Sequence, residues 1–199
     1  MKKTLIGALV GALIIFLWQF LSFAVVNLHK PAQQYTDKQE AIMSFLNSQG
    51  LKEGGYILPQ AGNNATMDEH EQFMKNAEGK PWAIIQYHNS LKNNMVMNMI
   101  RGYIVNVIIV LLFCWLINRF NAVNFSRIVT AALVVGLISF LNEPYTGYIW
   151  YQNFDIWAFL GDAVISWGLT GLWLAWWLTR GRSEHSTVVV RERPTEMAN

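Results

Sequence analysis

The stretch Thr4–Asn27, with the sequence TLIGALVGALIIFLWQFLSFAVVN, contains no Asp, Glu, Lys or Arg. A helix crosses the hydrocarbon core of a bilayer with roughly 20 apolar residues, and this stretch is longer than that. It therefore predicts a membrane-spanning anchor helix within residues 1–27.

Three more apolar stretches follow along the chain. They predict membrane-spanning helices at about 99–118, 126–145 and 156–179, which together form a membrane region over residues 99–182. The sequence thus predicts an all-α integral membrane protein with four transmembrane helices. A small extracytoplasmic α+β insertion over residues 28–98 separates the first helix from the second.

The third apolar stretch leaves two alternatives open. Its uncharged run Ile128–Leu141 is shorter than the hydrocarbon thickness of a bilayer. Either the helix begins earlier, at Val123–Phe125, or it continues past Pro144 with a kink and carries Glu143 below the headgroups.

The composition excludes several classes of protein. Of the 199 residues, 53% are hydrophobic and 14% are charged, whereas a soluble domain has nearer a quarter charged residues. The single cysteine, Cys114, excludes a disulfide framework and a multi-thiolate metal site. A net charge of +2 without a basic run gives nucleic acid no electrostatic footprint, so we expect the lipid bilayer, and not nucleic acid, as a partner.

Basic residues set the expected orientation, because Lys and Arg concentrate in short cytoplasmic segments. The loop between the third and fourth helices has neither. We therefore expect a multi-pass protein of the bacterial inner membrane with both termini cytoplasmic and a cytoplasmic tail over residues 183–199. The basic residues expected inside are Lys2, Lys3, Arg119, Arg127, Arg180, Arg182, Arg191 and Arg193.

The first helix also resembles a signal peptide, with Ser22-Phe23-Ala24 as a possible cleavage site. Its apolar run is too long for such a segment, and bulky side chains crowd its end. An uncleaved anchor is the favoured interpretation, and cleavage stays the alternative.

Aromatic residues gather at both predicted membrane surfaces, where amphipathic rings prefer to lie. We interpret them as interfacial anchors. They are Trp173, Trp176 and Trp177 at the cytoplasmic end of the fourth helix, and Tyr145, Tyr148, Trp150, Tyr151 and Trp157 at the opposite surface.

The insertion 28–98 reads as helix, strand, helix, strand. The run Thr36-Asp37-Lys38-Gln39-Glu40 reads as the start of a first helix, with capping-box partners at the right spacing, and Thr66 with Glu69 has the spacing of a second capping box. Tyr56–Leu58 and Trp82–His88 have the residue types of strands.

Three ionisable residues are predicted near one depth of the bilayer: Arg101, Glu143 and Asp162. A charged side chain inside a bilayer is costly and usually faces a partner, so the functional hypothesis is an Arg101–Glu143–Asp162 cluster that relays protons, binds a cation or holds a headgroup. In the structural alternative, Arg101 and Glu143 extend to the interface and Asp162 makes one structural pair.

Small residues favour close helix packing. Gly7 and Gly11 lie four residues apart on the first helix, and Gly171 and Ala175 do so on the fourth. The spacing favours an internal contact for the fourth helix and leaves open, for the first, whether the contact is internal or between subunits.

No motif of a known reaction occurs, so we do not expect a catalytic residue. The histidines, His29, His70, His88 and His185, are scattered and are expected at surfaces or interfaces. The Met-rich run Met95–Met99 invites a copper site, since thioethers select Cu(I), but residues two apart do not share a helix face. We therefore expect no metal and no cofactor.

The layout resembles small four-helix bacterial inner-membrane proteins of unknown function. The resemblance lies in a lysine-led anchor helix with Trp18, the segment Phe140-Leu141-Asn142-Glu143, the segment Leu160-Gly161-Asp162-Ala163 and a Trp-rich end. It covers the membrane helices alone and implies topology, with no catalytic residues to carry over.

These features favour a non-enzymatic accessory or scaffolding subunit whose outer region contacts a membrane-protein partner or a second copy of the chain. The alternative is a small ion-coupled transporter or channel-like oligomer that uses Arg101, Glu143 and Asp162. A lipid-modifying enzyme at the outer interface is a third, weaker possibility.

Overall fold

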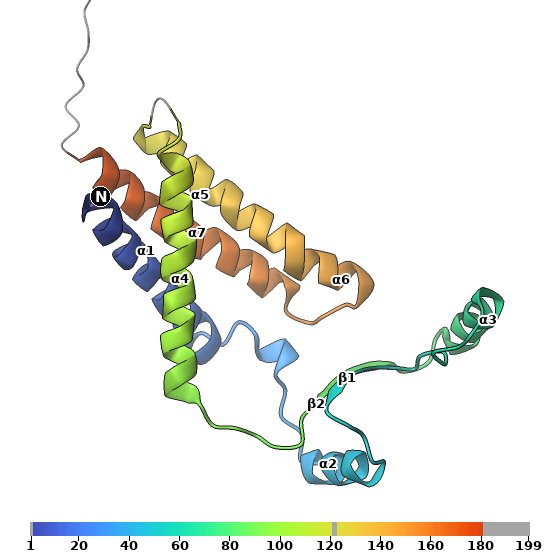
Figure 1. Cartoon of the computed structure of the whole chain (residues 1–199). Helices are drawn as coiled ribbons and strands as arrows, with labels where there is room; N and C mark the ends of the chain where they lie inside the picture. The colour runs from blue at the N-terminus through green and yellow to red at the C-terminus, as the bar shows by residue number, and fades with distance from the viewer. Residues whose placement is uncertain (1, 121–122, 181–199) are drawn as a thin grey trace, which may run out of the picture. The chain divides into compact units, whose positions relative to one another are not determined.

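The computed structural model describes residues 2–120 and 123–180 (Figure 1). The chain divides into two units: residues up to Gln34 together with those from Val96 onward, and Tyr35–Met95. Residues 28–34, which the sequence assigns to the outer insertion, thus belong to the helical unit. The predicted cytoplasmic tail 183–199 lies outside the described residues.

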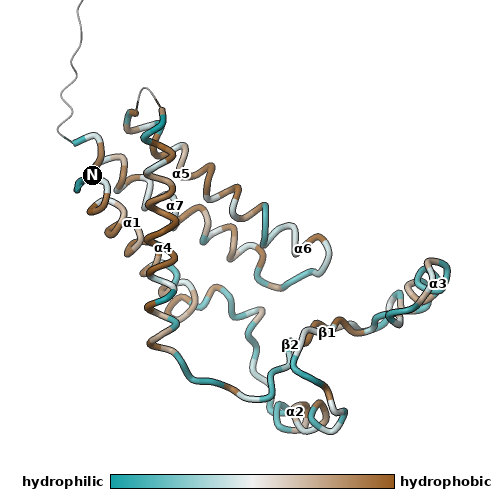
Figure 2. Tube along the Cα trace, in the orientation of Figure 1, coloured by the Kyte–Doolittle hydropathy of each residue, from teal (hydrophilic) through white to brown (hydrophobic). Residues whose placement is uncertain are grey.

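The first unit is a helical bundle. Its segments are α1 (Lys2–Phe20) with the π-helical turn η1 (Leu21–Val25), the 3-10 turn η2 (Lys30–Ala32), α4 (Met95–Ile117), α5 (Phe125–Phe140) with the π-helical turn η3 (Leu141–Tyr145), α6 (Thr146–Trp150) and α7 (Ile156–Thr179). In the described part of the chain, four segments are long and apolar enough to cross a membrane: Lys2–Val25, Met95–Ile117, Phe125–Trp150 and Ile156–Thr179. This confirms the predicted number of such helices, and Figure 2 shows hydrophobic residues along α1, α4, α5 and α7.

The ends of two helices can be compared with the limits that the sequence predicts. The third apolar helix begins at Phe125, before the uncharged run Ile128–Leu141, and it also continues past Pro144, so each alternative holds in part. The π-helical turn η3 contains the proline, and the Thr146 hydroxyl donates to the Leu141 carbonyl at 2.8 Å. The helix α4 begins at Met95, four residues before the predicted start at about 99, so the Met-rich run Met95–Met99 is helical.

The helix α7 packs against both α1 and α5. Small residues line the α5–α7 contact: a Cβ added at Gly171 would lie 2.6 Å from the Ala132 Cβ, and one at Gly136 would lie 2.7 Å from the Ala163 carbonyl oxygen. Gly7 and Gly11 of α1, which face side chains of α7, are also buried. The glycines therefore let the helices approach closely.

Side chains of α7 donate hydrogen bonds to backbone carbonyls of α1. The Trp177 indole donates to Lys3 at 2.7 Å, the Trp173 indole to Gly7 at 3.0 Å, and the Thr170 hydroxyl to Gly11 at 3.3 Å. The indole N–H groups of Trp173 and Trp177 thus bind α1 and stabilise its contact with α7.

The second unit contains α2 (Gln39–Ser48), β1 (Gly54–Leu58), α3 (Met67–Ala77) and β2 (Ala83–Tyr87). The two strands are antiparallel, with Gly54 opposite Tyr87 and Leu58 opposite Ala83. The order of elements is as predicted.

The two predicted helix starts in this unit differ in outcome. Thr66 and Glu69 form the predicted capping box at α3, whereas α2 starts at Gln39 without a side-chain cap. There, the Lys38 amide donates to the Thr36 hydroxyl at 3.2 Å, so Thr36 orders the turn before the helix instead.

Candidate functional site

A reversal of the chain after α1 builds the site. Asn27 has a φ of 59°, the left-handed conformation in which asparagine often ends a helix. The Leu28 amide then donates back to the Ser22 carbonyl at 2.9 Å. This turn places the next residue, His29, against the bundle that the chain has just left.

His29 is completely buried. Each of its two ring nitrogens faces a carboxylate, one from the N-cap residue of α7 and one from within α7. Nδ1 lies 2.8 Å from Asp155 Oδ2, and Nε2 lies 3.0 Å from Asp162 Oδ2. The Trp18 indole of α1 donates to the other Asp162 oxygen, Oδ1, at 2.9 Å. We call these four residues, Trp18, His29, Asp155 and Asp162, the His29 cluster.

Aromatic rings cover the imidazole. Phe23 stacks on it with centroids 3.8 Å apart and planes within 6°, and Phe159 meets it edge-on at 4.8 Å. These rings replace water around His29, and hydrogen bonds to charged groups are stronger where water is excluded. They also hold the ring in one orientation, with a nitrogen toward each carboxylate.

Asp155 occupies the N-cap position of α7, yet its side chain caps no backbone amide. An aspartate at this position ordinarily accepts from the first amides of its own helix. Here the carboxylate binds His29 instead, while it still lies at the helix end whose dipole favours negative charge. Asp155 therefore binds His29 and does not cap α7.

The structure does not bring the predicted polar cluster together. Asp162 binds Trp18 and His29, whereas Arg101 and Glu143 are exposed, and over residues 2–120 and 123–180 neither forms an ion pair with Asp162. The contact that Asp162 makes is instead with a histidine from outside the predicted helices.

His29, which was expected at a surface or an interface, is not at the surface of the helical unit, since its exposure is 0%. One feature of the sequence does point to this cluster. Asp155 and Asp162 are seven residues apart, which is two helical turns and therefore one face. What the sequence did not show was the reversal at Asn27 that supplies the third member.

The four predicted packing residues, Gly7, Gly11, Gly171 and Ala175, are all buried. Around Gly11 the added Cβ would lie 3.1 Å from Val110 of α4 and 3.2 Å from Thr170 of α7. The stripe on α1 therefore faces this chain's own helices.

Metal ligation was also tested against the structure. Within the described ranges, no group of three or more His, Cys, Asp or Glu side chains is arranged to hold a metal ion. In the His29 cluster both ring nitrogens already face carboxylate oxygens, which leaves the histidine no lone pair directed at an ion.

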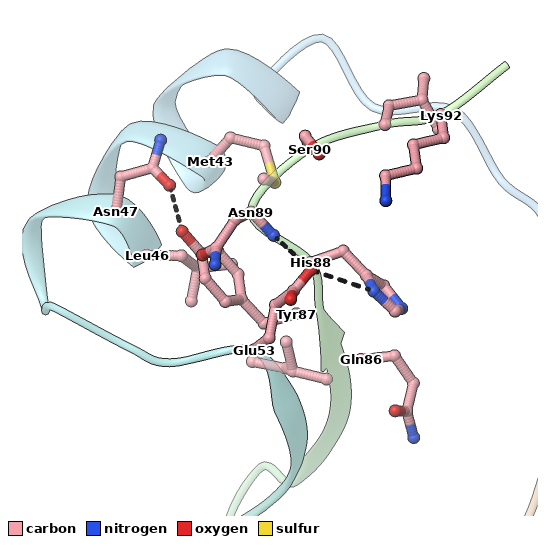
Figure 3. A pocket seen from close by; sticks show the side chains of 12 residues that line it. Met43, Leu46, Asn47, Glu53, Gln86, Tyr87, His88, Asn89, Ser90 and Lys92 are labelled. Carbon is pink, nitrogen blue, oxygen red and sulfur yellow. Dashed lines mark hydrogen bonds and ion pairs between the residues drawn. The ribbon is translucent and has the colours of Figure 1, made fainter.

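The second unit has a hollow of about 580 Å³ beside α2 and β2 (Figure 3). The Tyr87 hydroxyl donates to Asn47 Oδ1 at 2.6 Å, and Glu53 accepts from the Asn89 amide at 3.2 Å and lies 3.7 Å from the His88 ring. These contacts tie the end of β2 to α2 and to the segment before β1. His88 and Glu53 are mostly exposed, so the hollow is a surface feature.

The apolar side chains of the second unit are largely uncovered. Over residues 35–95, Tyr87 is the one buried hydrophobic side chain. Phe45 and Ile42, one helical turn apart on α2, are 63% and 49% exposed, and Ile84 on β2 is 45% exposed. This unit therefore lacks a hydrophobic core of its own.

No family model matches the chain, and no curated protein or solved structure matches it significantly. The site is therefore interpreted from its geometry.

Proposed function

We propose that the chain is a multi-pass protein of the bacterial inner membrane with both termini in the cytoplasm. Four helices of spanning length support the membrane part of the proposal. The excess of Lys and Arg in the segments expected inside supports the orientation.

We further propose that it acts as an accessory subunit whose unit 35–95 binds a partner protein. One observation carries this: the unit folds into two helices and a hairpin but buries a single hydrophobic side chain, Tyr87. Small domains are marginal even with a full core, and contiguous exposed apolar surface marks interaction sites. A protein surface that covers Ile42 and Phe45 of α2 would supply part of the missing burial.

Charge favours a protein over an anionic lipid surface as the occupant. Residues 35–95 contain seven acidic and five basic side chains, a net charge of −2. Basic segments, not acidic ones, bind the anionic headgroups of bacterial and other membranes.

Photocrosslinking in native membranes tests this function. A photoreactive residue replaces Phe45 on the apolar side of α2, and a matched variant carries it at Glu40 of the same helix. We expect a defined crosslinked product from position 45 that position 40 does not give, and recovery of the same partner in mild detergent. A product of twice the chain's mass would identify a second copy as the partner.

A protein that is recovered alone and monodisperse in mild detergent, with no product from position 45, would contradict the accessory role.

A second candidate function, ion-coupled transport, is favoured by the contact of Asp162 with His29 inside an apolar bundle, because paired acids and histidines in membrane segments form proton relays. Its test is proton flux in proteoliposomes. Flux that Asp162→Asn abolishes would support transport, and no flux from the wild-type chain would contradict it.

A further inference from the structure

The geometry of the His29 cluster sets the number of protons that it must hold. A neutral imidazole has one donor nitrogen and one acceptor nitrogen. Both nitrogens of His29 lie within hydrogen-bond distance of carboxylate oxygens, at 2.8 and 3.0 Å. With two ionised carboxylates, a neutral ring would therefore set a lone pair against a carboxylate lone pair.

One additional proton removes this conflict. It makes the ring an imidazolium that donates to both Asp155 and Asp162, or it resides on one carboxylate that then donates to the ring. In either form every contact is a hydrogen bond, and the cluster carries a net charge of −1. Without the proton, the charge is −2 and one of the two contacts is repulsive.

We propose that the His29 cluster is a binding site for a single proton, and that this proton fastens the segment after α1 to the beginning of α7. The ligand is the proton itself. The site lies in the helical unit, so the inference is independent of the partner proposed for residues 35–95.

The segment that the proton would hold in place, residues 26–34, has few other contacts with the bundle. Beyond the end of α1, Val26 is exposed, and the backbone is held by the Leu28 amide on Ser22 and by the 3-10 turn η2. His29 is the one fully buried side chain of the segment 26–34. When the cluster loses its proton, the repelled imidazole leaves its place, and the Leu28–Ser22 bond opens with it.

The groups that face His29 are few. From α7 and its cap position come Asp155 and Asp162, which are charged, and Phe159, which is not. From α1 and η1 come Phe23, which stacks on the ring, and Trp18, which reaches Asp162 and carries no charge. The neighbouring cation in the chain, Lys30, is exposed. Among the described residues, the charged groups in contact with His29 are therefore the carboxylates of Asp155 and Asp162.

Asparagine variants separate a proton-held contact from a merely structural one. In Asp162→Asn, the amide oxygen still accepts from Trp18, and the amide nitrogen donates to Nε2 of a neutral imidazole. The ring then donates from Nδ1 to Asp155, so every bond is kept without the additional proton. Asp155→Asn has the same logic at the other nitrogen.

The test is hydrogen exchange of the Leu28 amide, followed by mass spectrometry of the full-length protein in lipid nanodiscs. Exchange is measured from about pH 5 to pH 10, a range that brackets ordinary histidine titration, and is corrected for the intrinsic pH dependence of exchange. In the wild type we expect protection at low pH and a rise of about tenfold or more in the corrected rate as the proton is lost, because bonds to a charged group are given up.

In Asp162→Asn and Asp155→Asn we expect protection that persists across the whole range. A wild-type rate that stays constant from low to high pH would overturn the proposal. So would a transition that both asparagine variants retain, since neither needs the proton. If one variant fails to fold, the other and the wild-type profile decide the question.

Discussion

The helical bundle and the unit 35–95 both expose large hydrophobic side chains, but they differ in what lies beneath them. On α1, Leu5, Leu9, Leu13 and Leu17 are 39 to 50% exposed, and the same helix packs through Gly7 and Gly11 against α4 and α7. In the unit 35–95, Phe45 is 63% exposed, and no comparable core of buried side chains lies beneath it. We propose that lipid covers the exposed apolar surface of the packed bundle and that a partner protein covers the exposed apolar surface of the unit 35–95.

The two regions also differ in how they treat polar groups. The bundle buries His29, Asp155 and Asn106, each with a hydrogen-bond partner for its side chain, and it also buries the Ser22 hydroxyl, which has none. The unit 35–95 keeps its ion pairs, such as Lys75–Glu71, in the open. Substitutions should therefore have large effects in the bundle and small, local effects in the other unit.

The largest effect is expected for His29→Ala. It leaves Asp155 and Asp162 facing a void, and removing one member of a buried ion pair costs about 3–5 kcal/mol. Thermal unfolding in detergent should show this loss of stability. Adding Asp155→Asn and Asp162→Asn to the same chain should recover part of it, and a triple variant no more stable than His29→Ala would contradict the electrostatic explanation.

A smaller effect is expected where two helices meet most closely. Gly171→Ala places a Cβ 2.6 Å from that of Ala132, and such overpacking costs about 1–3 kcal/mol. The matched control, Gly161→Ala on the same helix, meets nothing within 4 Å and should be neutral or slightly stabilising. Equal unfolding temperatures for the two variants would show that α5 and α7 do not pack in this way.

In the second unit, Tyr87→Phe removes the hydroxyl that donates to Asn47. One such bond is worth about 1 kcal/mol. Hydrogen exchange should increase in α2 and β2 and remain unchanged in the four apolar helices. A change that spread to the bundle would contradict the independence of the two units.

The smallest effect is expected for the stability of the first turn of α3 as the pH falls. Hydrogen bonds from the backbone and side chain of Thr66 lower the pKa of Glu69 below its ordinary value of 4.5. The charged carboxylate thus stabilises the start of α3 above that value, and the contribution declines as the pH falls from 4.5 through the lowered pKa of the folded chain. Exchange of the first α3 amides should rise in acid, whereas Glu69→Gln, whose neutral amide still accepts, should show no such dependence.

Much of the bundle could be predicted because membrane insertion requires long uncharged runs: α7 occupies the predicted range 156–179. The capping box at Thr66 was likewise visible as a local pattern. The partner of Asp162 was not, because it depends on one backbone reversal at Asn27 that brings together residues far apart in the sequence. The contacts of Trp173 and Trp177 with α1 could not be predicted for a related reason: residue type shows that an indole seeks an acceptor, but not whether this is a headgroup or a carbonyl of α1.

The difference between the two regions can be measured by cysteine labelling. Phe45→Cys, with Cys114 buried in the bundle and therefore inert, is exposed to a membrane-impermeant maleimide in native membranes and in nanodiscs of purified protein. Lys75→Cys, at a polar site on α3, is the control and should react in both. We predict that Cys at position 45 is protected in native membranes and reacts in nanodiscs, because a partner protein covers it only in the former. Equal reaction in both, or protection in both, would contradict the account.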